Sequence, residues 1–432
     1  MIITGVVLCI ILLALILLQV PVGASLALVG FVGLVILTNL PSALGALSTS
    51  VYSCLASYSM SVVPLFVLMG YFAFQAGLSH DVYRAASVWL SRVRGGMAIA
   101  TIIGCGGFAA CCGSSVATGA TMTAIALPEM RKYGYSERLI TGSLAAGGVI
   151  GILIPPSICF VIYGIITEQS IGKLFMAGIL PGILEILSFI VTIQILCRLK
   201  ADIAPATQSS NLPVREKLTA LVQTWPIVLL FGVVIGGIYG GIFTPTEAGG
   251  VGAFGALILM LVRGKLDREN FTTALSNTAR TTAMVFFILI GATIFGYLLA
   301  VSQLPMQVAE WIAPLPINRY LILAGVLIFI TMLGLLMDTL AIILLVIPVI
   351  FPAMVELGFD PIWFGVIIVK VSEIALITPP VGLNVYVVKG AAPDVELLTI
   401  FRGIIPFLIA DVINVLILIA FPQISLFLPG LM

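Results

Sequence analysis

Hydrophobic residues occur along this chain in long blocks that short polar stretches separate. A helix that crosses a bilayer needs about 20 apolar residues, and ten blocks are long enough for one crossing each. They lie at 2–19, 22–38, 61–78, 138–166, 175–197, 221–242, 247–262, 281–301, 361–388 and 400–421. The pattern predicts an all-α integral membrane protein that spans the bilayer many times.

Two further apolar blocks, at 95–128 and 320–352, are too long for one simple crossing. Arg92 and Arg94 precede the first block, and Arg131 follows it. Because Lys and Arg resist translocation, both ends of this block should lie on the cytoplasmic side. Each block is therefore predicted to be a re-entrant helical hairpin, the first one turning at glycine and serine. Non-helical backbone at that depth must be shielded by protein or face a watery cavity.

Composition and charge support this picture. Only 9% of the 432 residues are charged and 61% are hydrophobic, whereas soluble domains carry about 25% charged residues. If the N-terminus lies outside, ten crossings put both termini outside and most Lys and Arg inside, as the positive-inside rule requires. The residues placed inside are Arg84, Arg92, Arg94, Arg131, Lys132, Arg138, Arg198, Lys200, Arg215, Lys217, Arg263, Lys265, Arg268, Arg280, Lys389 and Arg402.

Several function classes are excluded by what the sequence lacks. Its formal net charge of +1 gives no sign of a nucleic-acid partner. His80 is the single histidine, so a metal site or proton relay built on several imidazoles is excluded. The sequence has no nucleotide-binding loop and no Ser-His-Asp set, which favours a secondary transporter without an organic cofactor over a primary pump or an enzyme.

An internal repeat divides the chain, because matching residues recur at one constant offset. Transporters are often built from inverted repeats. Each half here has five crossings and one hairpin, and because five is odd the second half should have the opposite orientation. The predicted units are a first repeat at 1–197, a cytoplasmic linker at 198–220 and a second repeat at 221–432. The offset relates Pro155-Pro156 to Pro379-Pro380, Pro128 to Pro352, Gly134 to Gly358, Ser114 to Asp338 and Pro21 to Pro245.

In each repeat, a hairpin tip should meet a broken helix near the middle of the membrane. The breaks lie at the Pro-Pro pairs, within 138–166 and 361–388. Proline removes a backbone donor and frees carbonyl oxygens, and such oxygens suit Na⁺. The N-termini of half-helices suit an anionic substrate. Proline and glycine also serve as kinks and packing points in membrane helices, but two breaks at one repeat position favour the functional interpretation.

Some charged residues in or beside apolar segments need an explanation. Asp338 could be a carboxylate ligand for a coupling cation, or a helix N-cap at the hairpin tip, or both. Lys370 and Glu373 are three apart on one predicted helix and can form a structural salt bridge, which we favour over a substrate contact. Glu247 is interpreted as an interfacial or packing residue.

Five segments spread over the chain resemble the large membrane subunit of the tripartite ATP-independent periplasmic (TRAP) transporters, the DctM type, within the wider ion-transporter superfamily. The segments are PVGASLALVG at 21–30, CCGSSVATGATM at 111–122, GILIPPS at 151–157, GIFTPTEAGGVGA at 241–253 and LITPPVGLN at 376–384. The resemblance implies a bacterial inner-membrane protein that imports a small organic acid, such as a C4-dicarboxylate or a sialic acid. The implied mechanism is a Na⁺-driven elevator, in which a transport domain slides past a static scaffold. Two partners are also implied, a small four-helix membrane subunit and a periplasmic substrate-binding protein.

On the family pattern, Na⁺ sites form where hairpin tip and helix break meet, and the substrate lies between the two sites. The alternative is a stand-alone Na⁺/carboxylate symporter of the same superfamily, which needs no binding protein. The implied Na⁺ ligands are Gly113, Ser114, Ser115, Thr118, Gly148, Gly151, Pro155, Asp338, Thr339, Thr378, Pro379 and Gly382. The implied substrate contacts are Ser115, Pro156, Ser157, Asp338, Thr339, Pro380 and Asn384.

Overall fold

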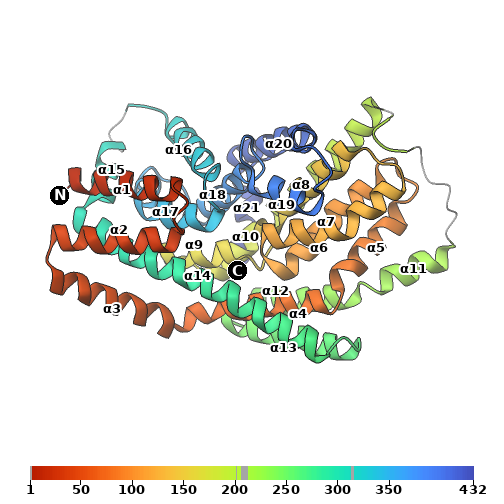
Figure 1. Cartoon of the computed structure of the whole chain (residues 1–432), viewed down its shortest axis with the longest axis horizontal. Helices are drawn as coiled ribbons and strands as arrows, with labels where there is room; N and C mark the ends of the chain where they lie inside the picture. The colour runs from red at the N-terminus through yellow and green to blue at the C-terminus, as the bar shows by residue number, and fades with distance from the viewer. Residues whose placement is uncertain (1, 201, 206–212, 313–315) are drawn as a thin grey trace.

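A computed structural model describes residues 2–200, 202–205, 213–312 and 316–432, and this part of the chain contains helices and no strand (Figure 1). The prediction of an all-α fold is therefore confirmed. The first half contains α1 Ile2–Leu17, α2 Val22–Leu37, α3 Leu40–Ala56, α4 Val62–Gln75, α5 Leu78–Leu90, α6 Gly96–Cys112, α7 Ser115–Lys132, α8 Glu137–Leu153, α9 Ile158–Thr167 and α10 Ile171–Leu199.

The second half repeats much of this order of helices. The offset between the two Pro-Pro pairs also separates α7 from α17 at both ends, and the start of α8 from the start of α18. Both Pro-Pro pairs contain a cis peptide bond. The helices are α11 Val214–Val222, α12 Trp225–Tyr239, α13 Pro245–Val262, α14 Arg268–Ser302, α15 Leu304–Ile312, α16 Arg319–Gly334, α17 Thr339–Glu356, α18 Pro361–Ala375, α19 Leu383–Ala391, α20 Leu397–Ala420 and α21 Gln423–Leu426.

The helix bounds differ from the predicted elements at several places, among them α5 and α15, over which no element was predicted. No element was predicted over α3, whose serines and threonines donate hydrogen bonds back to carbonyls of the preceding turn instead of breaking the helix. The span predicted at 281–301 is the second part of α14, which is 35 residues long. In the predicted linker at 198–220, residues 201 and 206–212 lie outside the described part, and α11 already begins at Val214.

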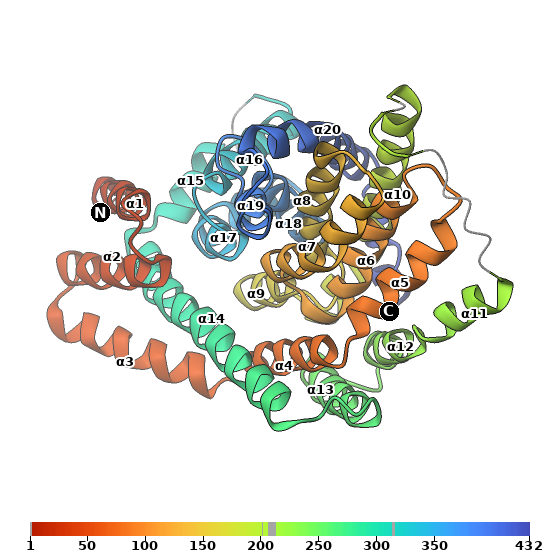
Figure 2. The ribbon, with the colours of Figure 1, turned by 45° about the vertical axis from the view of Figure 1, so that its right-hand side comes forward.

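Most of the helices fall into two groups. The frame helices, α1–α4 and α12–α14, pack mainly on one another, with α14 against α2, α3 and α4 and with α13 against α4. Glycine allows a close approach of α2 and α14, because a Cβ on Gly30 would lie 2.8 Å from the Phe295 nitrogen. The hairpin helices, α6–α10 and α16–α20, form the other group, and Figure 2 shows α14 passing beside them.

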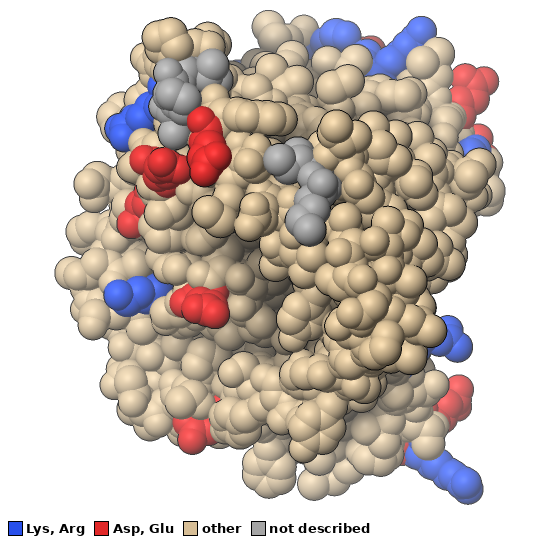
Figure 3. All heavy atoms as spheres, turned by 90° about the vertical axis from the view of Figure 1, so that its left-hand side faces the viewer, with Lys and Arg blue, Asp and Glu red and all other residues tan. Residues whose placement is uncertain are grey.

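The surface of the molecule is strongly apolar. Large side chains such as Ile3, Tyr52 and Val228 are 82%, 75% and 65% exposed. Figure 3 shows a face that is mostly tan, on which Lys, Arg, Asp and Glu form only a few small, separate groups. By length and composition, eight helices of the described chain can cross a membrane, and α1, α2, α6 and α16 are shorter apolar helices. These features support a multi-pass membrane protein.

Arg131 is the centre of one of the polar contacts that join the two repeats. Arg131, near the end of α7, donates to Glu137 at 2.7 Å and to Asp394, in the loop after α19, at 2.6 Å. Glu137 is the first residue of α8, so the guanidinium links the base of the first hairpin to the second repeat. A backbone hydrogen bond and the Arg131 guanidinium lower the pKa of Asp394.

This contact gives a first testable prediction. A lowered pKa means that Asp394 stabilises the fold above the ordinary pKa of an aspartate, and that this stabilisation disappears as the pH falls through the lowered value. In thermal unfolding, the Tm of wild type should therefore fall more on acidification than the Tm of Asp394→Asn. The plots of Tm against pH for the two proteins should meet at acidic pH. Glu216→Gln, on exposed α11, should follow wild type throughout. Parallel curves for wild type and Asp394→Asn would contradict the assignment.

Candidate functional site

A cavity of about 640 Å³ lies where the two hairpins face the frame helices. Both hairpin tips line it, as do residues beside both helix breaks and residues of α4 and α14. The structure therefore places both hairpin tips, and residues beside both breaks, around one space. The lining residues are Val67, Tyr71, Gly113, Ser114, Ser115, Val116, Ala117, Ala120, Ile152, Ile158, Cys159, Thr281, Met284, Val285, Asp338, Thr339, Leu340, Leu376 and Leu383.

The tip of the first hairpin packs closely on the first break. Gly113 has a left-handed backbone (φ +61°), and a Cβ there would lie 2.6 Å from the Pro156 carbonyl oxygen. A Cβ on Gly151 would lie 2.7 Å from Thr118 Oγ1 and 3.0 Å from the Ser114 carbonyl oxygen. The Thr118 hydroxyl donates to that same carbonyl at 2.7 Å. Glycine at these two positions thus lets hydroxyl and carbonyl oxygens from two chain segments come together.

The tip of the second hairpin places a carboxylate on the cavity. Asp338 occupies the N-cap position of α17, near the backbone amides of Leu340 and Ala341, but its side chain makes no capping hydrogen bond. The adjacent Thr339 hydroxyl is buried and has no hydrogen-bond partner. Asp338 thus stands at the N-cap of α17 and also lines the cavity, so its position fits both predicted roles, the ligand and the helix cap. The second break contributes Leu376 and Leu383 to the lining.

Asn384 brings the second break against the first repeat. It is fully buried, and neither its amide nitrogen nor its carbonyl oxygen has a hydrogen-bond partner. A Cβ on Gly148 would lie 3.1 Å from Asn384 Nδ2 and 3.2 Å from the Gly119 Cα. Gly148 thus contacts both α7 and α19. The side-chain amide of Asn384 lies beside it, and a buried amide without a hydrogen-bond partner is rare in native structures.

The other predicted residues belong to the two breaks but do not line the cavity. In the first break they are buried, and the Ser157 hydroxyl caps α9. In the second break, the Thr378 hydroxyl donates to the Ile374 carbonyl at 2.7 Å, and Gly382 has a left-handed backbone (φ +63°) before α19. Pro155, Pro156 and Ser157 make up the first set, and Thr378, Pro379, Pro380 and Gly382 the second.

Frame helices supply cavity residues that were not predicted from the sequence. Tyr71 on α4 and Thr281 on α14 face the cavity, and their hydroxyl oxygens are 3.1 Å apart. Both sit in helices whose sequences read as apolar spans, so no local motif marked them. The cavity therefore lies between the frame helices and the hairpin helices.

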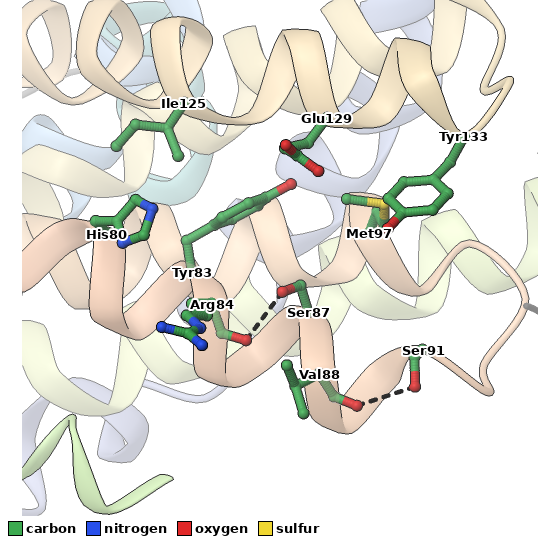
Figure 4. A pocket seen from close by; sticks show the side chains of 10 residues that line it. All are labelled: His80, Tyr83, Arg84, Ser87, Val88, Ser91, Met97, Ile125, Glu129 and Tyr133. Carbon is green, nitrogen blue, oxygen red and sulfur yellow. Dashed lines mark hydrogen bonds between the residues drawn. The ribbon is translucent and has the colours of Figure 1, made fainter. Parts of the chain in front are cut away.

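A second cavity, of about 510 Å³, lies at the base of the first hairpin (Figure 4). It is lined by residues of α5, the start of α6 and the last turns of α7, among them His80, Tyr83, Arg84 and Glu129. The Tyr83 hydroxyl points toward Glu129 in Figure 4. Because all of its lining comes from one repeat and from neither break, this cavity does not combine the elements predicted to form a transport site.

The remaining charged residues differ in part from their predicted roles. Lys370 does pair with Glu373, at 3.8 Å, but Glu185 at 2.6 Å and Asp411 at 2.7 Å are its nearer partners. Glu247 is exposed and forms a capping box with the residue before α13. It therefore caps a helix N-terminus instead of packing against neighbouring helices.

Comparison with known proteins identifies the family. The model of the family described as "Tripartite ATP-independent periplasmic transporter, DctM component" matches residues 9–424. The chain belongs to this family. The DctM-type resemblance of the sequence motifs is thereby confirmed, and the chain is a TRAP large membrane subunit, a transporter component and not an enzyme.

Relatives of this DctM-type protein match over most of their length. The "C4-dicarboxylate TRAP transporter large permease protein DctM" of Pseudomonas aeruginosa is 36% identical over 407 residues, which cover 94% of each chain. The "Sialic acid TRAP transporter large permease protein SiaM" of Vibrio cholerae is 32% identical over 412 residues, 95% of each chain. The "2,3-diketo-L-gulonate TRAP transporter large permease protein YiaN" of Escherichia coli is 33% identical over 388 residues, 87% of this chain and 86% of the relative.

A solved structure shares the fold of this DctM-type chain. The crystal structure of the YdaH transporter of Alcanivorax borkumensis superimposes with a TM-score of 0.62 and covers 89% of this chain and 90% of that one, at 17% sequence identity. At this identity the likeness concerns the fold alone.

Proposed function

We propose that this chain is the subunit of a Na⁺-coupled secondary transporter that carries a small organic acid anion through the cavity between the two hairpin tips. One observation carries the proposal: the N-termini of α7, α9, α17 and α19 meet at that cavity. Helix N-termini present unpaired backbone amides and a positive dipole end, which favour an anion. The relatives named for a C4-dicarboxylate and a sialic acid support an organic acid as substrate.

Oxygen atoms of the first repeat fit Na⁺. The Ser114 carbonyl and the Thr118 hydroxyl lie against Gly151, and the Pro156 carbonyl lies against Gly113. Unwound backbone in transporters commonly supplies such oxygens to Na⁺. The first tip and the first break together would therefore hold one ion.

The second repeat offers oxygens of the same kind. The Asp338 carboxylate faces the cavity, and the neighbouring Thr339 hydroxyl is buried without a partner. These two groups would hold a second ion through side chains. Ser115, which lines the cavity, is then a candidate to contact the substrate between the two ions, whereas Ser157 and Asn384, also predicted for this role, lie outside its lining.

The proposed mechanism is an elevator, in which the hairpin helices move as a body along the frame helices. The cavity supports it, because hairpin tips and breaks form one wall and α4 and α14 the other. Unequal exposure of the two breaks also supports alternating access: Pro155 and Pro156 are buried, while their counterparts Pro379 and Pro380 are exposed. In an alternating-access transporter, one end state is expected to expose the break of one repeat and to bury the equivalent break of the other.

The proposal includes a location and two partners. We place the chain in a bacterial inner membrane with both termini on the periplasmic side, because that orientation puts most Lys and Arg in the cytoplasm. A periplasmic binding protein would deliver the substrate, and a small four-helix membrane subunit would complete the transporter. The tripartite family name supports both partners.

Asp338→Asn tests the ion site. Losing one charged ligand should cost about 1.5–3 kcal/mol of Na⁺ binding, so the Na⁺ concentration for half-maximal uptake should rise about tenfold or more. The measurement is uptake as a function of Na⁺ in liposomes that contain the chain and its partner proteins. Glu356→Gln, at the exposed far end of α17, is the matched control. Equal losses of folded protein and of Na⁺ dependence in Asp338→Asn would indicate a structural role instead.

A further inference from the structure

Four buried ionisable residues lie where α10, α18 and α20 pack together. Glu185 is on α10, Lys370 and Glu373 are on α18, and Asp411 is on α20, and each is fully buried. We name this set the Lys370 cluster. With every group ionised, three carboxylates face one ammonium, and two negative charges remain without a cation.

An uncompensated charge is costly in a protein core. Burial removes the hydration of a carboxylate, and only a close cation and hydrogen bonds compensate for that loss. Without them, the carboxylate takes up a proton. The fully ionised form of the cluster is therefore disfavoured. A proton or a metal ion must reduce its negative charge.

Distances single out one of the three carboxyl groups. The Lys370 Nζ lies 2.6 Å from Glu185 Oε1 and 2.7 Å from Asp411 Oδ1. Glu373 Oε2 is 3.8 Å from the ammonium, too far for a hydrogen bond. Neither oxygen of Glu373 has any hydrogen-bond partner. Two carboxylates thus share the ammonium, and the third is an unpartnered, buried acceptor that faces into the cluster.

The atoms around Glu373 fit a proton better than a metal. No group of three or more His, Cys, Asp or Glu in the described chain is arranged to hold a metal ion. Both oxygens of Glu185 and Asp411 Oδ2 are buried acceptors that also have no hydrogen bond, although Glu185 Oε1 lies 2.6 Å from the ammonium nitrogen. A protonated carboxyl would add an O–H donor to a set of four side chains that otherwise offers the Lys370 ammonium alone.

We propose that the Lys370 cluster is a proton-binding site and that Glu373 holds its proton at neutral pH. The proton comes from water and converts the Glu373 carboxylate to a carboxylic acid, which leaves one ammonium between two carboxylates. The inference rests on the cluster alone and does not depend on the proposed Na⁺ coupling.

Few other groups near Glu373 could titrate with it. Apart from Glu185, Lys370 and Asp411, the titratable side chain that faces it among the described residues is the Cys159 thiol on α9. The neighbouring helices α8, over 139–153, and α17, over 339–355, contain no titratable side chain. A pH effect that Glu373→Gln removes can therefore be assigned to the Lys370 cluster.

Infrared spectroscopy of the purified full chain in lipid bilayers tests the proposal directly. At neutral pH we expect the carbonyl stretch of a protonated carboxylic acid in wild type and its loss in Glu373→Gln. Glu310→Gln, which changes an exposed glutamate of α15, should retain it. Exchanging K⁺ for Na⁺ should leave the band in place. Identical bands in wild type and Glu373→Gln, or removal of the band by Na⁺, would overturn the assignment.

Thermal unfolding supplies an independent readout. If the folded chain keeps a proton that the unfolded chain releases, wild-type Tm should fall as the pH rises above the range in which a free glutamate ionises. Gln resembles the protonated form of Glu, so Glu373→Gln should match wild type in acid and exceed its Tm at neutral and alkaline pH. Asp411→Asn, which removes a carboxylate bonded to Lys370, should lower Tm at neutral pH. A Tm of Glu373→Gln below that of wild type at neutral pH would contradict a protonated Glu373.

Discussion

Replacing Lys370 by Met should destabilise the protein by about 3–5 kcal/mol, because removing one partner of a buried ion pair leaves the other charges uncompensated. Glu185 and Asp411 would lose the ammonium that lies 2.6 and 2.7 Å from them. The two carboxylates come from different repeats, so the loss also weakens the packing of α10 against α20. Thermal unfolding of the purified chain, together with its yield from membranes, measures the effect.

Two comparisons make this result specific. Lys265→Met removes an exposed lysine and should leave Tm unchanged. The triple change Lys370→Met, Glu185→Gln and Asp411→Asn removes the charges together and should recover much of the lost stability, since neutral groups can often replace a buried ionic cluster without loss. A wild-type Tm in Lys370→Met would show that the ion pairs do not stabilise the fold.

Gly151→Ala should reduce Na⁺-driven uptake by about tenfold or more, which corresponds to a loss of about 1.4 kcal/mol at the ion site. The new Cβ would lie 2.7 Å from Thr118 Oγ1 and 3.0 Å from the Ser114 carbonyl oxygen. To relieve that contact, the hydroxyl must move away from the carbonyl to which it donates, so the proposed ligands separate. The measurement is the initial uptake rate in liposomes at several Na⁺ concentrations.

A matched control separates this effect from helix stability. A Cβ on Gly325, in α16, would meet nothing within 4 Å, so Gly325→Ala should keep the wild-type uptake rate. In an open helix position, alanine should even stabilise the chain slightly relative to glycine. Equal uptake rates for Gly151→Ala and wild type would show that this contact between tip and break does not hold the ion.

The elements around the cavity could be predicted because their sequence signals are local and repeated. The Pro-Pro pairs recur at one offset, as do Ser114 and Asp338, and α7 and α17 begin at that same offset. Tyr71 and Thr281 could not be predicted, because nothing in an apolar span marks the side that faces a cavity. Only the packing of α4 and α14 beside the hairpin helices reveals it.

The partners of Lys370 show a different limit. Spacing along one helix suggested Glu373, but the nearer carboxylates lie on two other helices, and spacing within a helix carries no information about them. The repeat did contain a clue, because Glu185 and Asp411 occupy the same position counted from the starts of α10 and α20. Two acidic residues at equivalent positions in apolar helices are a reason to look for one shared cation.

The central claim is that Na⁺ and an organic acid anion use the cavity between the two hairpin tips. Its most direct test is uptake into liposomes that contain the wild-type chain with its small membrane subunit and binding protein, under matched inward gradients of Na⁺ and of K⁺. Rapid accumulation with the Na⁺ gradient and almost none with the K⁺ gradient is the predicted result. Equal uptake with both gradients would contradict the claim.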